Sequence, residues 1–408
     1  MFLLGQTVSL FGSSLVQYAI VWYVTLTTSS GIMMTISTLC GFLPQIAISL
    51  FAGVWADRFN RKRLIMLSDS VIAVSTLILA LLYLAGYRRL WLLFLISAVR
   101  SAGAGVQIPA VNALIPQLVP PNRLMQVNGI NGSLQSLTTI VSPAVAGWVL
   151  SIVGMDLSPV LFIDLGTAVV GVGLLGILRV PSVPRVEQEA GPLRDLRNGF
   201  SYIFGHRFLR ALLIIYAVLM FLITPAAMLT PLMIERTYGS EVWRLTWNEV
   251  LFSVGSVAGG LMIAAWGGFR NRVHTIVLAG AMFGSMTILM GILPGFPVYL
   301  FLVTLAGTAM PFFTSPSIVL LQEKVETEMQ GRVFSFVQIV GSAALPVGML
   351  VFGPLADWIG RVQILLIVSG AGVLLLSGLI LRARSLVAEG LPPEPSADAA
   401  SSSPEGPV

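Results

Sequence analysis

The sequence predicts an all-α membrane protein with twelve transmembrane helices arranged as two six-helix bundles. The first reason is composition: of 408 residues, 56% are hydrophobic and only 10% are Asp, Glu, Lys or Arg, against roughly 25% in a typical soluble domain. The second is that apolar runs of about 20 residues, the length that crosses a bilayer, recur along the chain. The third is that short sequence segments of the first half recur at corresponding positions in the second half. A soluble fold could not cover its surface with so few charges.

The apolar runs form two sets of six with a polar stretch between them. The predicted spans are 2–26, 32–56, 65–86, 90–112, 125–151, 159–180, 208–235, 247–268, 274–294, 297–320, 332–352 and 362–382. The two bundles are therefore expected at 1–180 and 208–385. Residues 181–207 are interpreted as a cytoplasmic linker with a helix at the membrane surface. The tail 386–408, rich in Pro, Ser, Ala and Glu, cannot bury a core and is expected to be disordered.

The basic residues predict the orientation. With the N-terminus in the cytoplasm, 17 Lys and Arg residues fall on the cytoplasmic side, five fall outside, and Arg100 lies within a span. Cytoplasmic loops of membrane proteins carry an excess of Lys and Arg, so both termini are expected in the cytoplasm, with the chain in the cell membrane. The pI near 9.7 does not indicate nucleic acid, because the basic residues lie in short loops between apolar runs.

Two segments of the first half recur in the second. Arg123, Ile130, Gly132 and Ser133 match Arg332, Ile339, Gly341 and Ser342 at one offset, and Trp55, Asn60 and Arg61 match Trp266, Asn271 and Arg272. These pairs fall in the fifth and eleventh spans and around the second and eighth. Parallel repeats of six helices place a substrate path at the interface between the halves.

A charged loop joins the second and third spans. It reads Gly53-Val-Trp-Ala-Asp57-Arg58-Phe-Asn60-Arg61-Lys62-Arg63. Gly53 permits close helix contact, Asp57 can hold a cation or a helix N-terminus, and the basic run anchors the loop on the cytoplasmic face. An ordinary positive-inside loop is the alternative interpretation.

This loop resembles the signature Gly-x-x-x-Asp-Arg-x-Gly-Arg-Arg of the major facilitator superfamily, and the resemblance covers nearly the whole chain. Asn60 stands where that family usually has Gly, and we expect it to tolerate a left-handed backbone. Asp69, early in the third span, is expected to pair with Arg58 or Arg61 in the gate. Within the superfamily, Gln6 to Ser14 and Phe51 to Arg58 resemble the bacterial macrolide and multidrug efflux branch.

Three charged residues inside the spans are candidates for proton coupling: Arg100, Asp164 and Glu249. A charge in a membrane is costly, so it normally has a partner or a function. Arg100 and the glycines after it resemble the superfamily's fourth-helix motif, which implies a role in proton coupling; an Arg that bonds to carbonyls or reaches the interface is the alternative. For Asp164 and Glu249, a structural role is the alternative.

The fifth span carries Ser142-Pro143-Ala-Val-Ala-Gly147. This resembles a degenerate form of Gly-Pro-x-x-Gly-Gly, which is typical of the superfamily's exporters. Small residues at this spacing permit tight helix packing, and that is also the alternative interpretation.

Several polar and aromatic residues within the spans are candidates to line a substrate path, although bonding between helices would equally explain each of them. They are Gln17, Tyr18, Trp22, Asn128, Gln135 and Gln338.

The sequence predicts a secondary active transporter, driven by protons, that exports bulky amphipathic drugs such as macrolides by alternating access. A gradient must supply the energy, because neither lysine fits a Gly-x-x-x-x-Gly-Lys-Ser/Thr loop.

The expected partners are a small-molecule substrate, protons and the bilayer, and the chain is expected to be a monomer. We expect no cofactor and no metal, since Cys40 is the single cysteine and the two histidines are far apart. Export of a siderophore or another metabolite is the alternative; a membrane-embedded receptor or enzyme would need a cluster of catalytic groups or a ligand domain.

Overall fold

The computed structural model describes residues 1–178, 180, 200–293 and 295–391, and every regular element in them is a helix. The first half contains α1 (Phe2–Thr28), α2 (Gly31–Arg58), α3 (Arg61–Leu84), α4 (Leu90–Leu118), a short 3₁₀ turn (Pro121–Arg123), α5 (Leu124–Ile152) and α6 (Ser158–Ile177). The second half contains α8 (Arg207–Met228), α9 (Thr230–Tyr238), α10 (Val242–Trp266), α11 (Arg272–Ile292), α12 (Phe296–Lys324), α13 (Thr327–Ile359), α14 (Val362–Arg382) and α15 (Arg384–Glu389). With α8 and α9 taken together, twelve helical segments are long and apolar enough to cross a membrane, which confirms the predicted fold class.

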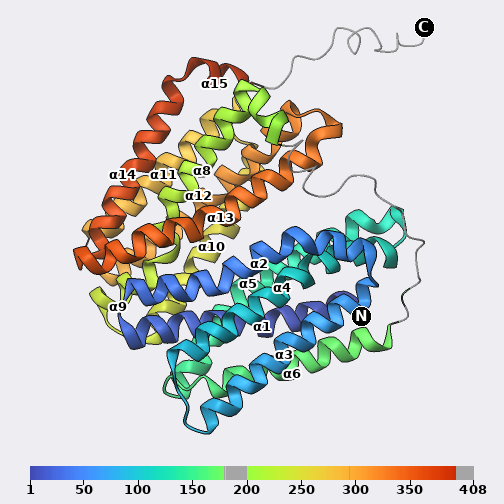
Figure 1. Ribbon diagram of the computed structural model, residues 1–408. Coiled ribbons are helices and arrows are strands. Elements are labelled where there is room, and N and C mark those ends of the chain that lie inside the picture. The colour runs from blue at the N-terminus through green and yellow to red at the C-terminus, as the bar shows by residue number, and fades with distance from the viewer. Residues whose placement is uncertain (179, 181–199, 294, 392–408) are drawn as a thin grey trace.

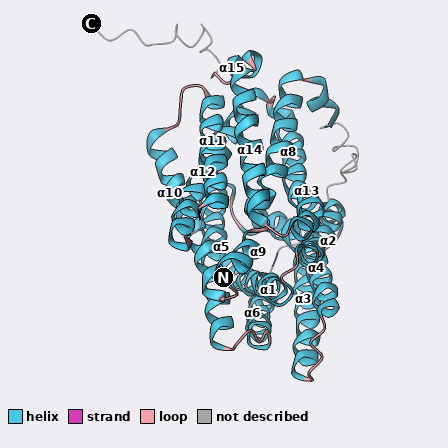
Figure 2. Cartoon of the chain, turned by 90° about the vertical axis from the view of Figure 1, so that its left-hand side faces the viewer, coloured by secondary structure: helices cyan, strands magenta, loops and turns pink. Residues whose placement is uncertain are grey.

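The two halves pack side by side mainly through two helix pairs, α2 with α13 and α5 with α10, and α1 also contacts α9. In Figure 1 the halves meet at the end that carries the α1–α2 turn and α9, and they diverge toward the end that carries the N-terminus and α15. We call these the closed end and the terminal end. Figure 2 shows the same helices from the side of α9 and α1.

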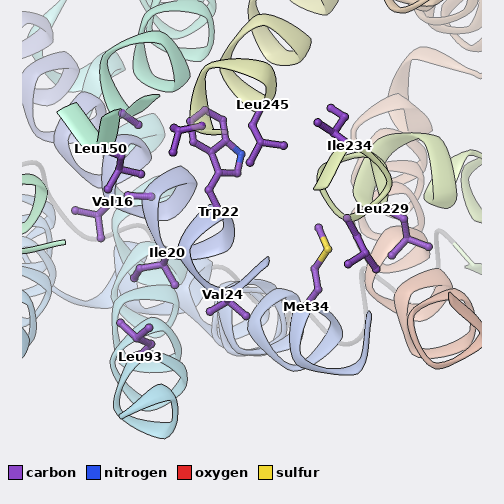
Figure 3. Close-up of a cluster of buried hydrophobic side chains, with 14 of the residues drawn as sticks. Val16, Ile20, Trp22, Val24, Met34, Leu93, Leu150, Leu229, Ile234 and Leu245 are labelled. Carbon is purple, nitrogen blue, oxygen red and sulfur yellow. The ribbon is translucent and has the colours of Figure 1, made fainter. Parts of the chain in front are cut away.

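A hydrophobic cluster joins the halves at the closed end (Figure 3). Val24 and Met34 from the first half and Leu229 and Ile234 from the second half all belong to it, and each is at most 2% exposed. Because lipid tails are as apolar as these side chains, close packing rather than the hydrophobic effect holds such helices together. The cluster therefore depends on the fit between the two halves at this end.

The seventh span is broken into α8 and α9 at Leu229. Pro225 lies inside α8 and Pro231 lies in the first turn of α9. Proline lacks a backbone N–H, so it interrupts a helix in its interior and is tolerated in a first turn. Both helices together occupy the predicted seventh span.

The end of the second half extends slightly beyond the expected boundary at 385. Helix α15 continues to Glu389 and is tied to the bundle: Arg272 N donates to Gly390 O at 2.8 Å, and Lys324 and Glu389 form an ion pair at 2.7 Å. The rest of the predicted tail, 392–408, lies outside the described residues. So does most of the predicted linker, of which residues 200–205 are helical.

Candidate transport pathway

A cavity of about 760 Å³ lies between the two halves. Its walls come from α2 and α4 on one side and from α8 and α13 on the other. Polar groups in the lining include Gln45 and Asn112 of the first half and Gln338 and Ser342 of the second half. The lining residues of α2 and α13 belong to the middle of each helix and to the part nearer the terminal end, so the cavity lies between the molecule's centre and that end.

Of the six predicted path residues, one lies in the lining of this cavity. Gln338 lies in the cavity lining. Trp22 is 1% exposed in the hydrophobic cluster, and Tyr18 packs on it with ring centroids 5.8 Å apart. Neither residue lies in the cavity lining, and their place on the path stays a prediction. A large aromatic ring on a helix surrounded by apolar neighbours is best accommodated by burial.

The other three path candidates lie away from the cavity lining. Gln17 lies against Gly41, between α1 and α2: a Cβ on that glycine would be 2.7 Å from Gln17 Nε2. Asn128 and Gln135 are exposed on α5. Gln45, a lining residue, was missed because one amide in an apolar helix has no distinguishing spacing.

Arg100 forms a buried ion pair with Asp164. The guanidinium contacts Asp164 and the hydroxyl of Thr76, and Arg100 and Asp164 are 7% and 1% exposed. Asp164 also accepts hydrogen bonds from Thr76 Oγ1 at 3.0 Å and from Ser13 Oγ at 3.4 Å. Four helices (α1, α3, α4 and α6) therefore supply one polar site. The close approach of α1 to α6 at this site requires a glycine, because a Cβ on Gly12 would lie 1.9 Å from Thr167 Oγ1.

A second buried polar layer lies next to this one, around Asp69. Asp69 is 2% exposed, and its Oδ1 accepts hydrogen bonds from Gln107 Nε2 at 2.5 Å and from Ser9 Oγ at 3.4 Å. Its Oδ2 has no partner among the described residues. A buried carboxylate oxygen without a donor is costly, whereas a protonated carboxyl needs fewer donors.

The two layers form a ladder through the first half. Asp69 and Thr76 are seven residues apart on α3, as are Gln107 and Arg100 on α4, which separates the layers by about 10 Å. We refer to the residues of both layers as the polar ladder: Ser9, Ser13, Asp69, Thr76, Arg100, Gln107 and Asp164.

The expected pairing of Asp69 with Arg58 or Arg61 is wrong. Asp69 lies eight residues along α3 from Arg61, a rise of about 12 Å. Arg61 donates instead to the carbonyl oxygens of Ala56 at 2.9 Å and Ala113 at 2.7 Å, and Arg58 is exposed.

The basic residues of the signature loop satisfy carbonyl groups at helix ends. Lys62 Nζ donates to the carbonyl oxygens of Gly176 and Leu178, at 2.8 and 2.7 Å. Positive charge is favourable at a helix C-terminus, where carbonyls lack partners. The loop thereby joins the ends of α2, α4 and α6. The burial and contacts of Gly53 and Asp57 lie outside the described residues.

Asn60 does not adopt the left-handed conformation that we expected. Its φ is −65°, and its side-chain oxygen accepts from Arg63 N at 3.2 Å as the N-cap of α3. Asn is among the most favoured N-cap residues, so its role as the N-cap of α3 explains why Asn rather than Gly stands at this position.

Glu249 lies apart from the polar ladder, in the second half. It lines a cavity of about 110 Å³ together with Thr230, Phe252 and residues of α11 and α12. Its Oε1 accepts from Asn248 Nδ2 at 3.2 Å, and Tyr299 Oη donates to Asn248 Oδ1 at 2.8 Å. The structure therefore brings together two of the three predicted coupling residues and leaves Glu249 in a site of its own.

The Ser142–Gly147 segment lies where α5 contacts α10 of the other half. Ser142 and Pro143 are buried, and a Cβ on Gly147 would lie 1.7 Å from Thr246 Oγ1. The segment thus contributes to the contact between the halves, in the part of α5 nearer the closed end.

Comparison with known proteins agrees with this architecture. The sequence profile of the Major Facilitator Superfamily matches residues 2–349. Macrolide efflux protein A of Streptococcus pyogenes is 31% identical over 360 residues, 87% of this chain and 88% of that protein. The multidrug efflux pump Tap of Mycolicibacterium fortuitum is 23% identical over 358 residues, covering 86% and 87%. A bacterial homologue of the human lysosomal transporter Spinster, solved in an inward-facing, unoccupied conformation, superposes with a TM-score of 0.67 at 15% identity and covers 95% of both chains.

The fold and the cavity between its halves define a multi-pass membrane transporter rather than an enzyme. The chain belongs to the Major Facilitator Superfamily.

Proposed function

We propose that this transporter exports bulky amphipathic compounds, macrolides among them, in exchange for protons. The proposal rests on the volume and the lining of the cavity between the halves. Its volume of about 760 Å³ is in the range of pockets that hold drug-sized ligands. Its lining combines apolar side chains with amides and hydroxyls and includes no acidic or basic residue.

The cargo class is drawn from the relatives and from the cavity's chemistry. The macrolide efflux protein of Streptococcus pyogenes spans nearly the same length as this chain at 31% identity. A lining without a positive charge suits a neutral or weakly charged amphipath better than an anionic metabolite, which would normally be matched by Arg or Lys. Macrolides therefore fit better than an anionic chelator.

The proposed orientation places the terminal end in the cytoplasm and the closed end outside a cell membrane. The excess of Lys and Arg in the loops at the terminal end supports it. In this orientation the cavity faces the cytoplasm, where an exporter binds its cargo. One chain supplies both halves of the cavity, so a monomer is sufficient.

The polar ladder is the proposed proton site. Its two carboxyl groups lie in adjacent buried layers of the first half, Asp164 paired with Arg100 and Asp69 bonded to Gln107, and an acid buried in a membrane normally has a functional role. Protonation would change the charge of the first half while the halves rock around the cavity. Glu249, in its cavity in the second half, is a second candidate carrier.

Expression of the transporter in a drug-sensitive bacterium should lower the cellular accumulation of several macrolides severalfold. Dissipating the proton gradient with a protonophore should abolish this effect, because one charge crossing 100 mV supplies about 2.3 kcal/mol. The measurement is uptake of radiolabelled macrolides with and without the protonophore. Unchanged accumulation across the panel would contradict the proposed cargo, and protonophore-insensitive efflux would contradict proton coupling.

Asp69→Asn should uncouple transport without unfolding the protein. The amide oxygen can still accept from Gln107, while the side chain can no longer take up a proton. We expect proton-driven efflux from proteoliposomes to fall at least about tenfold, with downhill exchange of substrate retained. Asp156→Asn is the matched control, because that carboxylate pairs with Arg88 at 2.8 Å in an exposed loop. Proton-driven efflux at the parent rate in Asp69→Asn would remove this residue from the proton path.

A further inference from the structure

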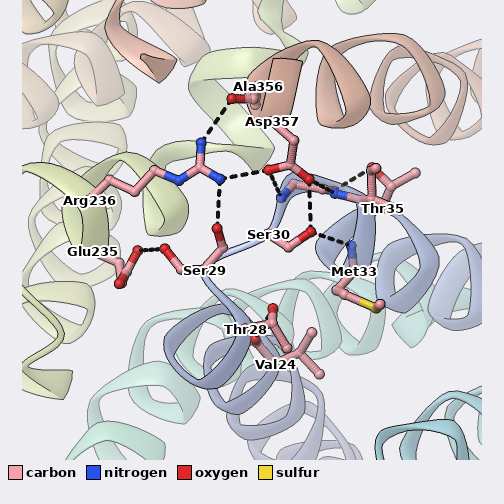
Figure 4. Close-up of polar contacts among 12 residues, drawn as sticks. Val24, Thr28, Ser29, Ser30, Met33, Thr35, Glu235, Arg236, Ala356 and Asp357 are labelled. Atoms are coloured by element: carbon pink, nitrogen blue, oxygen red, sulfur yellow. Dashed lines mark hydrogen bonds and ion pairs between the residues drawn. The ribbon is translucent and has the colours of Figure 1, made fainter. Parts of the chain in front are cut away.

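At the closed end, one carboxylate of the second half binds the start of a helix of the first half (Figure 4). Asp357, near the C-terminal end of α13, accepts hydrogen bonds from Gly31 N at 2.7 Å and from Ile32 N at 2.9 Å. Its Oδ2 also accepts from Ser30 Oγ at 2.8 Å. These amides belong to the first turn of α2, where N–H groups lack helical partners and a negative charge is favoured.

Arg236 of α9 completes the contact. Its guanidinium donates to Asp357 Oδ1 at 2.6 Å, to the carbonyl oxygen of Ser29 at 2.6 Å and to that of Ala356 at 2.8 Å. Next to it, Ser29 Oγ donates to Glu235 Oε2 at 2.5 Å. The charge-assisted bonds therefore tie the α1–α2 turn of one half to α9 and α13 of the other (Figure 4).

The backbones of α2 and α13 touch beside this network. A Cβ on Gly31 would lie 2.2 Å from Gly353 O, and one on Gly353 would lie 1.7 Å from Thr35 Oγ1. Thr35 Oγ1 donates to Met349 O at 3.0 Å, across the same interface. Such contact exists only while the halves are together at this end.

The sequence around Asp357 repeats the signature loop at the opposite end of the molecule. Gly353, Ala356, Asp357 and Arg361 correspond to Gly53, Ala56, Asp57 and Arg61 with the same spacing. Both segments lie at the C-terminal end of a helix, α2 or α13, and these helices run in opposite directions along the interface between the halves. Each end of this helix pair thus carries an acid in an equivalent position.

We infer that Asp357, held by Arg236, is a positioning residue that latches the closed end, and that its bonds to α2 must break each time this end opens. The inference rests on the proposed function only for placing this end outside the cell. Because these bonds exist in one state and not in the other, their removal shifts the equilibrium toward the state that is open to the outside.

Labelling of a cysteine buried behind the latch tests this. Met34 is 2% exposed and packs with Leu229 and Ile234 of the other half. Met34→Cys, in a chain whose natural Cys40 is replaced by Ser, is reacted in intact cells with a membrane-impermeant maleimide. We expect Asp357→Asn and Arg236→Gln each to raise the initial labelling rate about tenfold or more, since bonds to charged groups are lost. Labelling after denaturation normalises for the total amount of protein. Ser30→Ala, which removes one bond to Asp357 and the N-cap bond from Met33 N, should give a smaller rise.

A second cysteine distinguishes a shift toward the state that is open to the outside from a general loosening of the packing between the halves. Ser342 is exposed and lines the cavity that opens toward the terminal end. In inside-out vesicles, Asp357→Asn should lower the labelling of Ser342→Cys, whereas loosening would raise it at both positions. Asp156→Asn, whose ion pair lies within the first half, should change neither rate. Labelling of Met34→Cys at the parent rate in Asp357→Asn, or a rise at both positions, overturns the inference. No cargo enters this assay, so its outcome is independent of the macrolide test.

Discussion

Arg100→Ala should abolish proton-driven transport and strongly destabilise the protein. The substitution leaves Asp164 buried in the first half with only hydroxyl donors, Thr76 and Ser13. Removing one partner of a buried ion pair typically costs about 3–5 kcal/mol, because the other charge stays unpaired. Thermal unfolding in detergent should therefore begin at a markedly lower temperature than in the parent, and proteoliposomes should show no efflux above background.

A double variant separates the two roles of this pair. Arg100→Met with Asp164→Asn removes both charges, and such neutral replacements of a buried ion pair are often tolerated or stabilising. We expect thermal stability to recover in the double variant while proton-driven efflux stays absent and downhill exchange returns. If the double variant pumps against a gradient at the parent rate, the Arg100–Asp164 pair is structural and the coupling role is wrong.

The twelve helices could be predicted from the sequence because the bilayer imposes a length and a composition on each one. Pairing between distant helices is a different matter. Arg100 and Asp164 are both recognisable as charges within spans, but they are 64 residues apart, and hydropathy does not say which faces of α4 and α6 meet. The nearness of Asp69 to the basic loop in sequence suggests a pairing between them. The rise of α3 instead carries it to the level of Gln107.

Asp357 escaped the sequence analysis for a related reason. It lies at the end of a span, where an acid is ordinary, and the parallel repeat of the halves pairs the second span with the eighth. The similar segments Gly53–Arg61 and Gly353–Arg361 lie at opposite ends of two antiparallel neighbouring helices, a relation that a parallel repeat of six helices does not predict. The cavity lining was hard to predict for another reason: a polar residue such as Gln45 can bond to a neighbouring helix or face the cavity, and only the packing distinguishes these.

Gly147→Val should block transport by holding the halves apart at the α5–α10 contact. Even a Cβ at this position would lie 1.7 Å from Thr246 Oγ1 and 2.9 Å from Thr246 Cβ, so the helices must separate or α5 must shift. Packed interfaces do not deform continuously, and a shift here removes the fit that closes this end. Efflux should fall at least about tenfold while the protein remains folded, as measured by uptake into inside-out vesicles alongside a thermal unfolding curve.

The same helix offers the matched control, and the partner helix offers the rescue. Gly132 also lies in α5, but nothing lies within 4 Å of a Cβ built there, so Gly132→Ala should transport normally. Gly147→Ala should impair efflux by itself and recover when combined with Thr246→Gly, because the second substitution removes the side chain that a Cβ would meet. Recovery in the pair would assign the exporter-type segment Ser142–Gly147 to contact between the halves. Impairment that persists after Thr246→Gly would instead indicate that Gly147 acts within α5 itself, and the steric explanation would be wrong.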